Sequence, residues 1–320
     1  MTESNTAMSA TLQQRIIQRT IGYIPYLIGF LILLFSNTFN WFASVNALLQ
    51  ILLFVLVVCI PAFLTKRMSY VDIGWPWGLV LIGVLVLVLG DGYWLRKYII
   101  AGMYLFAGLR MGLFALLFLK KGHLNTELPR YKFQRKRWEK GGYTNLDLSL
   151  QYEIMIQCFA NVTFLAIPAI LQAFNPQESL SVLEVSGYIL WIISFGMEHL
   201  ADMQKKRFLK KAYLENRKRQ CCNVGLWKYS RHPNYFAEWM VWNALILSSF
   251  SSLMYFYSRE NLLIWLGLLA ALLFISRIMY QTLVYYTGAV PSEYYSLKKR
   301  PGYRDYQKKT NMFFPGRPKE

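Results

Sequence analysis

The densest group of chemically versatile side chains lies between Gly225 and Glu238, which read Gly-Leu-Trp-Lys-Tyr-Ser-Arg-His-Pro-Asn-Tyr-Phe-Ala-Glu. This stretch is too polar to cross a bilayer, yet it leads directly into an apolar run. Polar groups near hydrocarbon are costly, and they usually mark a function. The candidates here are Tyr229, Arg231, His232, Asn234, Tyr235 and Glu238.

Pro233 predicts that a helix starts within this stretch, because proline has no N–H to lose in a first turn and its φ already suits a helix. A helix N-terminus offers free N–H groups and partial positive charge to a phosphate. Arg231 and His232 would add donors at the same point. The spacing fits equally well an interfacial cap in which Arg231 reaches a lipid phosphate.

A second cluster contains Glu198 and Asp202, which lie four residues apart and therefore share one face of a helix. Two carboxylates could accept hydrogen bonds from ribose hydroxyls, and the cations that follow, including Lys206, could meet phosphate. The alternative is a charge network at the helix end, in which the acids pair with Lys205 and Lys206.

The C-terminal segment alternates tyrosines with basic residues and contains two further candidates, Glu293 and Tyr303. Two interpretations fit this pattern. The segment could close as a lid over a nucleotide, or it could be a solvated basic tail whose aromatic rings lie on the membrane surface.

Two arginines, Arg110 and Arg277, lie within expected membrane spans. A buried arginine costs about 2.5–3.5 kcal/mol on insertion scales unless it is paired or hydrated. Asp72, at the start of the third span, is a natural partner for Arg110. That pair would serve structure or catalysis equally well.

The composition indicates an all-α, polytopic membrane protein. Of the 320 residues, 55% are hydrophobic and 16% are charged, which is unlike a soluble domain. Since a span needs roughly 20 apolar residues, the apolar runs predict about eight membrane helices, within a range of seven to nine. The runs fall at about 21–37, 45–64, 77–91, 98–119, 153–174, 184–200, 237–256 and 261–287.

The basic residues predict the topology. With eight spans and a cytoplasmic N-terminus, 30 of the 35 Lys and Arg fall on the inside, three fall in outside loops and two within spans. This is the distribution that the positive-inside rule expects, and it places both termini in the cytoplasm. The net charge of +18 is thereby assigned to the face near anionic lipids, so we expect membrane lipids as partners and no nucleic acid.

Three regions are expected: a cytoplasmic tail at 1–20, N-terminal helices at 21–119 that form part of a substrate cavity, and a C-terminal region at 120–320 whose inside loops bind a cofactor. The polar start without a small-residue cleavage site indicates a retained first helix. The cysteines are Cys59, Cys158, Cys221 and Cys222, and their placement does not suggest a disulfide framework.

The segment Tyr229–Glu238 resembles the Arg-His-Pro-Asn-Tyr-Phe-Gly-Glu signature of the steroid 5-alpha-reductase superfamily, in particular its bacterial-type DUF1295 branch. The resemblance extends in order through Ser69–Trp75, Glu127–Tyr131, Glu198–Lys206, Pro291–Glu293 and Tyr303–Pro315. It implies an oxidoreductase of lipid metabolism with seven or more helices, in which NADPH binds from the cytoplasmic side and reduces an activated C=C bond in a lipid such as a 3-oxo-Δ4 steroid. The membrane would be a bacterial inner membrane or the endoplasmic reticulum.

The resemblance also implies residue roles. Asn234, Glu238, Glu198 and Asp202 would line the cofactor cavity, with Arg231, His232 and Tyr235 beside them, and Arg110 would match a family arginine. The complete set predicted to bind the cofactor is Glu198, Asp202, Lys206, Tyr229, Arg231, His232, Asn234, Tyr235, Glu238, Arg277, Glu293 and Tyr303.

Two positions depart from the family pattern. Ala237 stands where glycine is usual, which leaves less room for the cofactor to approach the backbone. The Gln-Glu pair with which the animal enzymes polarise a steroid carbonyl is absent from the first four spans. The catalytic candidates are therefore Asp72, Tyr70 and Tyr104, together with Arg110.

Two other classes of protein remain open. A membrane methyltransferase of the isoprenylcysteine carboxyl type has a similar Arg-His-Pro motif but binds S-adenosylmethionine. A transporter would explain the arginines within spans, although the polar residues gather at helix ends and no repeat is present. We expect a lipid or steroid-like substrate, no metal and no obligate protein partner.

Overall fold

The computed structural model describes residues 2–217 and 219–319, with side chains at residue 14 and from residue 17 onward within those ranges. Every regular element in this part of the chain is helical, which confirms the all-α expectation. The chain divides into two compact units. Unit 1 comprises Met1–Leu128, Arg135–Ser179 and Ser252–Leu272, and unit 2 comprises Pro129–Gln134, Leu180–Ser251 and Leu273–Glu320.

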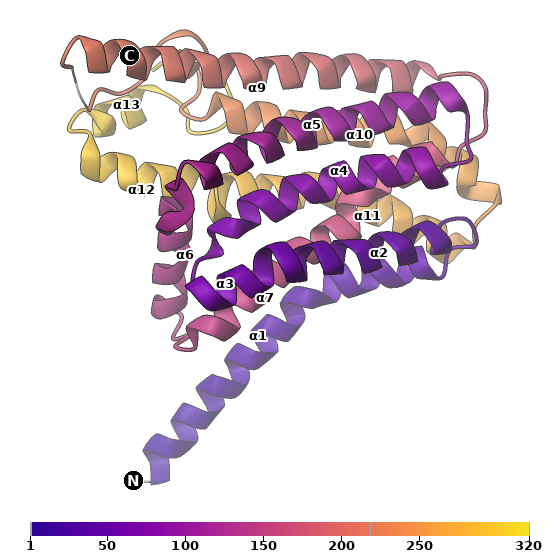
Figure 1. Cartoon of the computed structure of the whole chain (residues 1–320), viewed down its shortest axis with the longest axis horizontal. Helices are drawn as coiled ribbons and strands as arrows, with labels where there is room; N and C mark the ends of the chain where they lie inside the picture. Colours follow the sequence, from indigo (N-terminus) through magenta and orange to yellow (C-terminus); the bar gives the residue numbers. More distant parts are fainter. Residues whose placement is uncertain (1, 218, 320) are drawn as a thin grey trace. The chain divides into compact units, whose positions relative to one another are not determined.

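Figure 1 shows the helices in chain order. Unit 1 contains α1 (Thr2–Leu34), α2 (Asn40–Phe54), a π-helix (Val55–Cys59), α3 (Ile60–Thr65), α4 (Val71–Leu89), α5 (Trp94–Lys120), α7 (Leu146–Val162) and α8 (Ile167–Ala173). Unit 2 contains α9 (Val182–Leu214), α12 (Ala289–Lys299) and α13 (Tyr303–Lys309). Helices α6 (Pro129–Lys140), α10 (Pro233–Tyr255) and α11 (Leu262–Gln281) contribute residues to both units.

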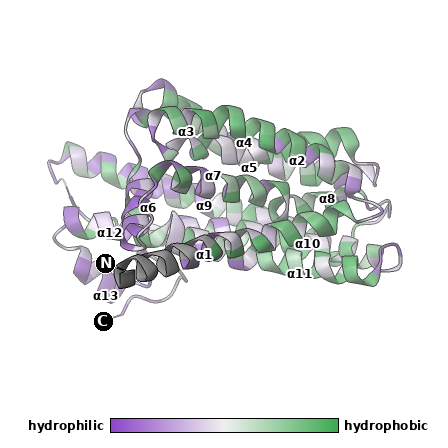
Figure 2. Cartoon of the chain, turned by 90° about the horizontal axis from the view of Figure 1, so that it is seen from below, coloured by the Kyte–Doolittle hydropathy of each residue, from purple (hydrophilic) through white to green (hydrophobic). Residues whose placement is uncertain are grey.

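Six segments of the described chain are long and apolar enough to cross a membrane, so the chain is a polytopic helical membrane protein. They are Ile17–Leu34, Asn40–Thr65, Met68–Leu89, Trp94–Lys120, Leu146–Ala173 and Leu262–Lys299. Helices α9 and α10 have 33 and 23 residues but are not among the six, because polar side chains lower their hydropathy. The expected number of eight spans therefore stays a prediction. Hydrophobic residues dominate α2, α4 and α11 (Figure 2).

The third span begins earlier than its apolar run. The apolar run begins at about 77, whereas α4 begins at Val71 and accommodates Pro76 inside the helix. Backbone hydrogen bonds define a helix start, and the hydropathy of Ser69–Trp75 is too low to show it. As a result, Asp72 lies in the first turn of a continuous helix.

Small residues let α4 and α5 pack closely, as is usual for membrane helices. A Cβ atom on Gly108 would lie 2.7 Å from the carbonyl oxygen of Pro76, and one on Gly112 would lie 2.9 Å from Nε1 of Trp77. No side chain fits at such distances. The glycines therefore fix the separation of the two helices that carry Asp72, Tyr104 and Arg110.

A network of buried amides joins α2, α4 and α7 in unit 1. Asn46 Nδ2 donates to the carbonyls of Asn161 and Val162 at 3.2 Å, and Gln50 Nε2 donates to the Gly78 carbonyl at 2.8 Å. Asn161 Nδ2 donates to the carbonyl of Trp75 at 3.2 Å. Hydrogen bonds between helices hold the polar groups where water is scarce, so this network sets the register of the three helices.

A single carboxylate anchors the start of α4. Glu127 is buried and accepts hydrogen bonds from the backbone N–H groups of Met68 and Ser69 at 2.9 and 3.1 Å. Arg135 NH2 lies 2.7 Å from the same carboxylate. Because a negative charge is stabilising at a helix N-terminus, Glu127 fixes the turn that presents Tyr70 and Asp72.

In unit 2, α9 and α10 each begin at a recognisable signal. Ser181 and Glu184 form a reciprocal capping box at the start of α9, and Pro233 opens α10 as expected. A Cβ atom on Gly187 would lie 2.6 Å from Ser248, so α9 approaches α10 closely at this glycine. α10 continues through Ser248–Ser252 to Tyr255 as one helix.

Candidate functional site

The turn at Gly225 docks the start of the motif onto α9. Gly225 has φ +55°, and a Cβ atom there would lie 2.4 Å from Gln204 Oε1. The same oxygen accepts a hydrogen bond from the Leu226 N–H at 2.8 Å, and Trp227 Nε1 donates to the carbonyl of Ala201 at 2.9 Å. Only glycine satisfies both the backbone angle and the close approach, so Gly225 places α9 beside the segment that leads into α10.

Asn234 brings two of the predicted clusters together. Its Nδ2 donates to Asp202 Oδ1 at 3.0 Å, across 32 residues of chain. This contact fixes the orientation of the amide group. Asn234 Oδ1 is buried and has no hydrogen-bond partner in the described structure, so it faces away from Asp202 as an acceptor. Asn234, Tyr235 and Glu238 lie on the first turns of α10, as the sequence predicts.

The acidic face of α9 carries an additional lysine. Glu198 is buried and Asp202 is exposed, and Lys205 lies three residues beyond Asp202 on the same side of the helix. Lys205 Nζ is 4.2 Å from the centroid of the Trp227 ring. Burial lowers the pKa of Lys205, with a further lowering from Arg300, while Cys222 and Asp202 oppose the shift. The cluster thus combines two carboxylates, an amide and a partly desolvated amine.

Arg231 holds the motif to the C-terminal segment. Its Nε and NH2 atoms lie 2.7 and 3.2 Å from the two oxygens of Glu293, and NH1 donates to the carbonyls of Gln307 and Thr310. Gln307 Nε2 donates to Glu293 Oε2 at 2.6 Å. Arg231 and Glu293 are both buried. This bidentate pair with added hydrogen bonds links α10, α12 and α13.

His232 belongs to the same network. Its Nε2 lies 3.1 Å from Glu293 Oε1, and its ring stacks on Tyr235 with centroids 5.4 Å apart. Burial lowers the pKa of His232, against the opposing effect of Glu293. A neutral imidazole that donates from Nε2 to the carboxylate satisfies this environment.

The C-terminal segment packs against the motif, so of the two interpretations the solvated tail does not describe it. The backbone N–H of Arg231 donates to the Asn311 carbonyl at 2.9 Å, and that of Gly316 donates to the Tyr229 carbonyl at 3.0 Å. Tyr303 and Phe313 are buried, and Phe313 meets Trp239 with ring centroids 6.0 Å apart. The tail is therefore a structural part of unit 2. Its role as a lid over a nucleotide stays a prediction.

The predicted catalytic residues lie in unit 1. Tyr70 and Asp72 stand at the start of α4 and are half-buried, as is Arg110 on α5. Tyr104 is buried and donates its hydroxyl hydrogen to the carbonyl of Leu165 at 2.6 Å. The pairing of Asp72 with Arg110 stays a prediction.

Three residues predicted to bind the cofactor lie on exposed surface. Tyr229 is 46% exposed, and Lys206 and Arg277 are also exposed. Arg277 lies within the candidate span Leu262–Lys299, with its side chain exposed on the surface of α11, and its depth in a membrane stays a prediction. Lys205 was expected only as a possible charge partner of the acids and not as a cofactor-binding residue, although its spacing from Glu198 and Asp202 is a usable signal. The positions of Gln204 and Gln307 were not predicted, because no local pattern reveals their long-range partners.

The long apolar helices and the polar cluster of α9 and α10 define a polytopic helical membrane protein with a candidate ligand site. Residues 58–310 match the model of the family described as protein of unknown function (DUF1295). The chain belongs to this family. No curated protein and no solved structure matches the chain.

Proposed function

We propose that this protein is a membrane-embedded reductase that uses NADPH to saturate an activated C=C bond, an enone, in a lipid such as a 3-oxo-Δ4 steroid. The resemblance of Tyr229–Glu238 to the steroid 5-alpha-reductase signature motivates this proposal. The observation that carries it is the unpartnered, buried Oδ1 of Asn234, whose Nδ2 atom is held by Asp202.

The residues of the cluster fit a dinucleotide. Asn234 Oδ1 lacks a hydrogen-bond partner and could accept a hydrogen bond from a ribose hydroxyl or an amide NH2 group. The carboxylates of Glu198, Asp202 and Glu238 are further acceptors of the type that ribose hydroxyls use. Lys205 and the N-terminus of α10 offer positive charge to a phosphate. We assign Arg231, His232, Glu293 and Tyr303 a supporting role, because Arg231 and His232 already direct their donors to Glu293 and to backbone carbonyls.

NADPH, when bound, supplies the hydride for the β-carbon of the enone. The chain must stabilise the negative charge that develops on the carbonyl oxygen, and a donor fixed in advance in a dry site does this best. Asp72, Tyr70 and Arg110 remain candidates for that donor. Tyr104 is less suited because its one hydroxyl hydrogen is donated to Leu165. The α-carbon then takes a proton.

Thermal melting of the detergent-purified protein tests the cofactor. A ligand of the folded state raises stability by about 2.7 kcal/mol at a hundredfold excess over its Kd. We expect NADPH to raise the melting temperature of the parent, and Asn234→Ala and Asp202→Asn to lose most of that rise. Asp305→Asn is the matched control, since Asp305 is an exposed acid of α13 outside the cluster.

The same experiment separates the alternative classes. A rise with S-adenosylmethionine and none with NADPH would favour the methyltransferase. If NADPH stabilises the parent and both cluster variants equally, the cofactor binds elsewhere. NADPH oxidation that depends on an added 3-oxo-Δ4 steroid then tests the substrate class.

A further inference from the structure

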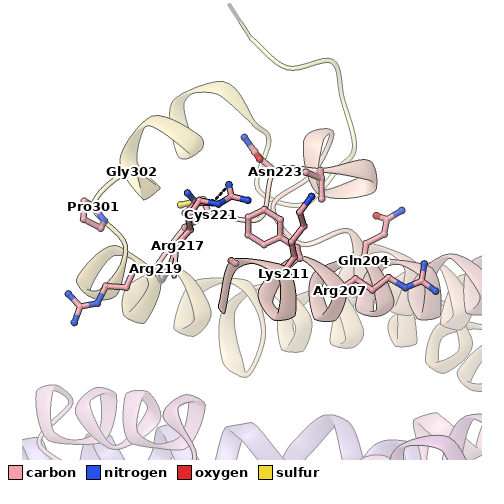
Figure 3. Close-up of a pocket in the computed structure, with 13 residues that line it drawn as sticks. Gln204, Arg207, Lys211, Arg217, Arg219, Cys221, Asn223, Pro301 and Gly302 are labelled. Atoms are coloured by element: carbon pink, nitrogen blue, oxygen red, sulfur yellow. Dashed lines mark hydrogen bonds between the residues drawn. The ribbon is translucent and has the colours of Figure 1, made fainter. Parts of the chain in front are cut away.

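A groove with a volume of about 960 Å³ lies in unit 2 between the end of α9, the loop that follows it and the turn at Pro301 (Figure 3). It is distinct from the cluster around Asn234. Lys211 lines the groove and follows Asp202 by nine residues. Nine residues amount to two and a half helical turns, so the groove occupies the side of α9 opposite to Asp202.

The groove is rich in cations. Arg207 and Lys211 come from α9, and Arg217 and Arg219 come from the following loop. Glu215 is the carboxylate beside them, 3.9 Å from Lys211 Nζ and in contact with Arg217. These pairs are exposed, and exposed pairs are weak because water and salt screen the charges. Among the described residues, four cations against one weakly paired carboxylate leave an electropositive groove for an anion.

The loop backbone holds one of these cations in a costly conformation. Asn216 has φ 52° and Arg219 has φ 72°. Asn216 follows the C-cap residue of α9, Glu215, and the Arg217 N–H donates to the Ala212 carbonyl at 2.8 Å, which is the ordinary pattern of a left-handed helix C-terminus. The cap does not account for Arg219. A non-glycine residue at positive φ is strained and often marks a functional position.

The walls of the groove are largely apolar. Phe208, Ala212 and Val224 contribute to its lining. Val224 is 42% exposed. Burial raises the pKa of the Cys221 thiol, so this lining residue adds no negative charge. A rim of cations around an apolar lining is typical of a surface that meets lipid.

We propose that this groove binds the phosphate group of an anionic phospholipid, with the apolar portion of the lipid against Phe208, Ala212 and Val224. The cations would bind a phosphate ester, a group that a soluble metabolite could also supply. The apolar lining favours the lipid, because a free phosphate ester makes no use of it. The site does not depend on the proposed reductase activity.

The test measures melting of the full-length protein in detergent at constant ionic strength. The probes are micelles doped with phosphatidylglycerol, micelles doped with phosphatidylcholine, sodium phosphate and glycerol 3-phosphate. The groove variant combines Arg207→Gln, Arg217→Gln and Arg219→Gln. The control variant removes the same charge elsewhere in unit 2 through Lys298→Gln, Arg304→Gln and Lys308→Gln, which are exposed cations.

We expect phosphatidylglycerol to raise the melting temperature of the parent and the control variant by about 3 °C or more, and the groove variant to lose at least half of this rise. Phosphatidylcholine and the soluble phosphates should have little effect. Should the triple variant fail to fold, Arg219→Gln alone should reduce the phosphorus that co-purifies with the protein, whereas Lys308→Gln should not.

Three results would overturn the proposal. If phosphatidylglycerol raised the melting temperatures of the groove variant and the control variant equally, the overall charge of the protein alone would account for its attraction to the lipid. A shift with glycerol 3-phosphate or sodium phosphate equal to that with phosphatidylglycerol would identify a soluble phosphate as the ligand. Loss of the NADPH-induced shift in the groove variant, with Asn234→Ala still responsive to NADPH, would assign the groove to the cofactor.

Discussion

Arg231 illustrates how the partners of a residue determine its role. Its sequence neighbours suggest phosphate binding, yet its guanidinium group meets Glu293 and two backbone carbonyls. Both charges are buried and well hydrogen-bonded, so the pair tolerates removal of neither partner. Arg231 therefore keeps the start of α10 in place, and Asn234, three residues later, depends on that placement.

Glu293→Gln should destabilise the protein by about 3–5 kcal/mol, because the isosteric amide leaves the buried Arg231 without a counter-charge. Thermal or denaturant unfolding in detergent measures this effect. Asp305→Asn removes an equal charge from an exposed pair with Lys308 and should cost less than about 1 kcal/mol. Equal melting of Glu293→Gln and the parent would show that the network adds no stability.

His232 makes the stability of the folded protein depend on pH, and the direction of its pKa shift gives the sign of that dependence. Its pKa in the folded protein lies below the ordinary value of 6.5, chiefly because the ring is buried, while Arg231 and Lys205 lower it further and Glu293 opposes them. As the pH falls, His232 is therefore protonated in the unfolded chain at a higher pH than in the folded protein. Stability from this residue is complete above about pH 7.5 and declines below about pH 6.5. Unfolding from pH 8 to pH 5 should show a shallower decline in His232→Gln, and parallel curves would contradict this prediction.

At the scale of elements, glycines and buried amides determine how the helices of unit 1 fit together. Gln50 and Asn161 converge on Gly78, where a Cβ atom would lie 2.1 Å from Asn161 Nδ2 and 2.6 Å from Gln50 Oε1. The periodicity of the apolar residues predicts the helices themselves. It does not predict which small residue faces which amide, because that depends on the register between helices.

Gly78→Ala should therefore cost about 1–3 kcal/mol, since overpacking displaces the amides and breaks their hydrogen bonds. Gly102→Ala, in α5 of the same unit, is the matched control because a Cβ atom there meets nothing within 4 Å. Melting temperatures of the two variants measure the difference. A neutral Gly78→Ala would mean that the network relaxes without loss.

At the scale of the whole molecule, the basic segment between residues 201 and 236 decides how α9 and α10 relate to the membrane. If neither α9 nor α10 crossed the membrane, the six remaining spans would still place both termini on the inside. The segment between residues 201 and 236, with its ten Lys and Arg residues, would then lie on the outside. The positive-inside rule disfavours that arrangement. Eight spans place the segment in the cytoplasm.

Single cysteines in a background without the native four test this topology in intact cells. We expect cysteines at Thr2, Lys210 and Lys319 to be shielded from an impermeant thiol reagent, and one at Glu178 to react. Labelling at Lys210 with shielded termini would support six spans. Labelling at Thr2 or Lys319 would refute cytoplasmic termini.

The sequence by itself determined the helical class, the start of α10 at Pro233 and the shared face of Glu198 and Asp202. Each depends on interactions within a few residues, such as proline geometry and helical periodicity, or on summed hydropathy. Only the tertiary structure decided that Asn234 meets Asp202, that Arg231 and His232 meet Glu293, and that the C-terminal segment packs against the motif. These contacts join residues 32 to 87 positions apart, and packing between helices, which no local pattern encodes, selects them.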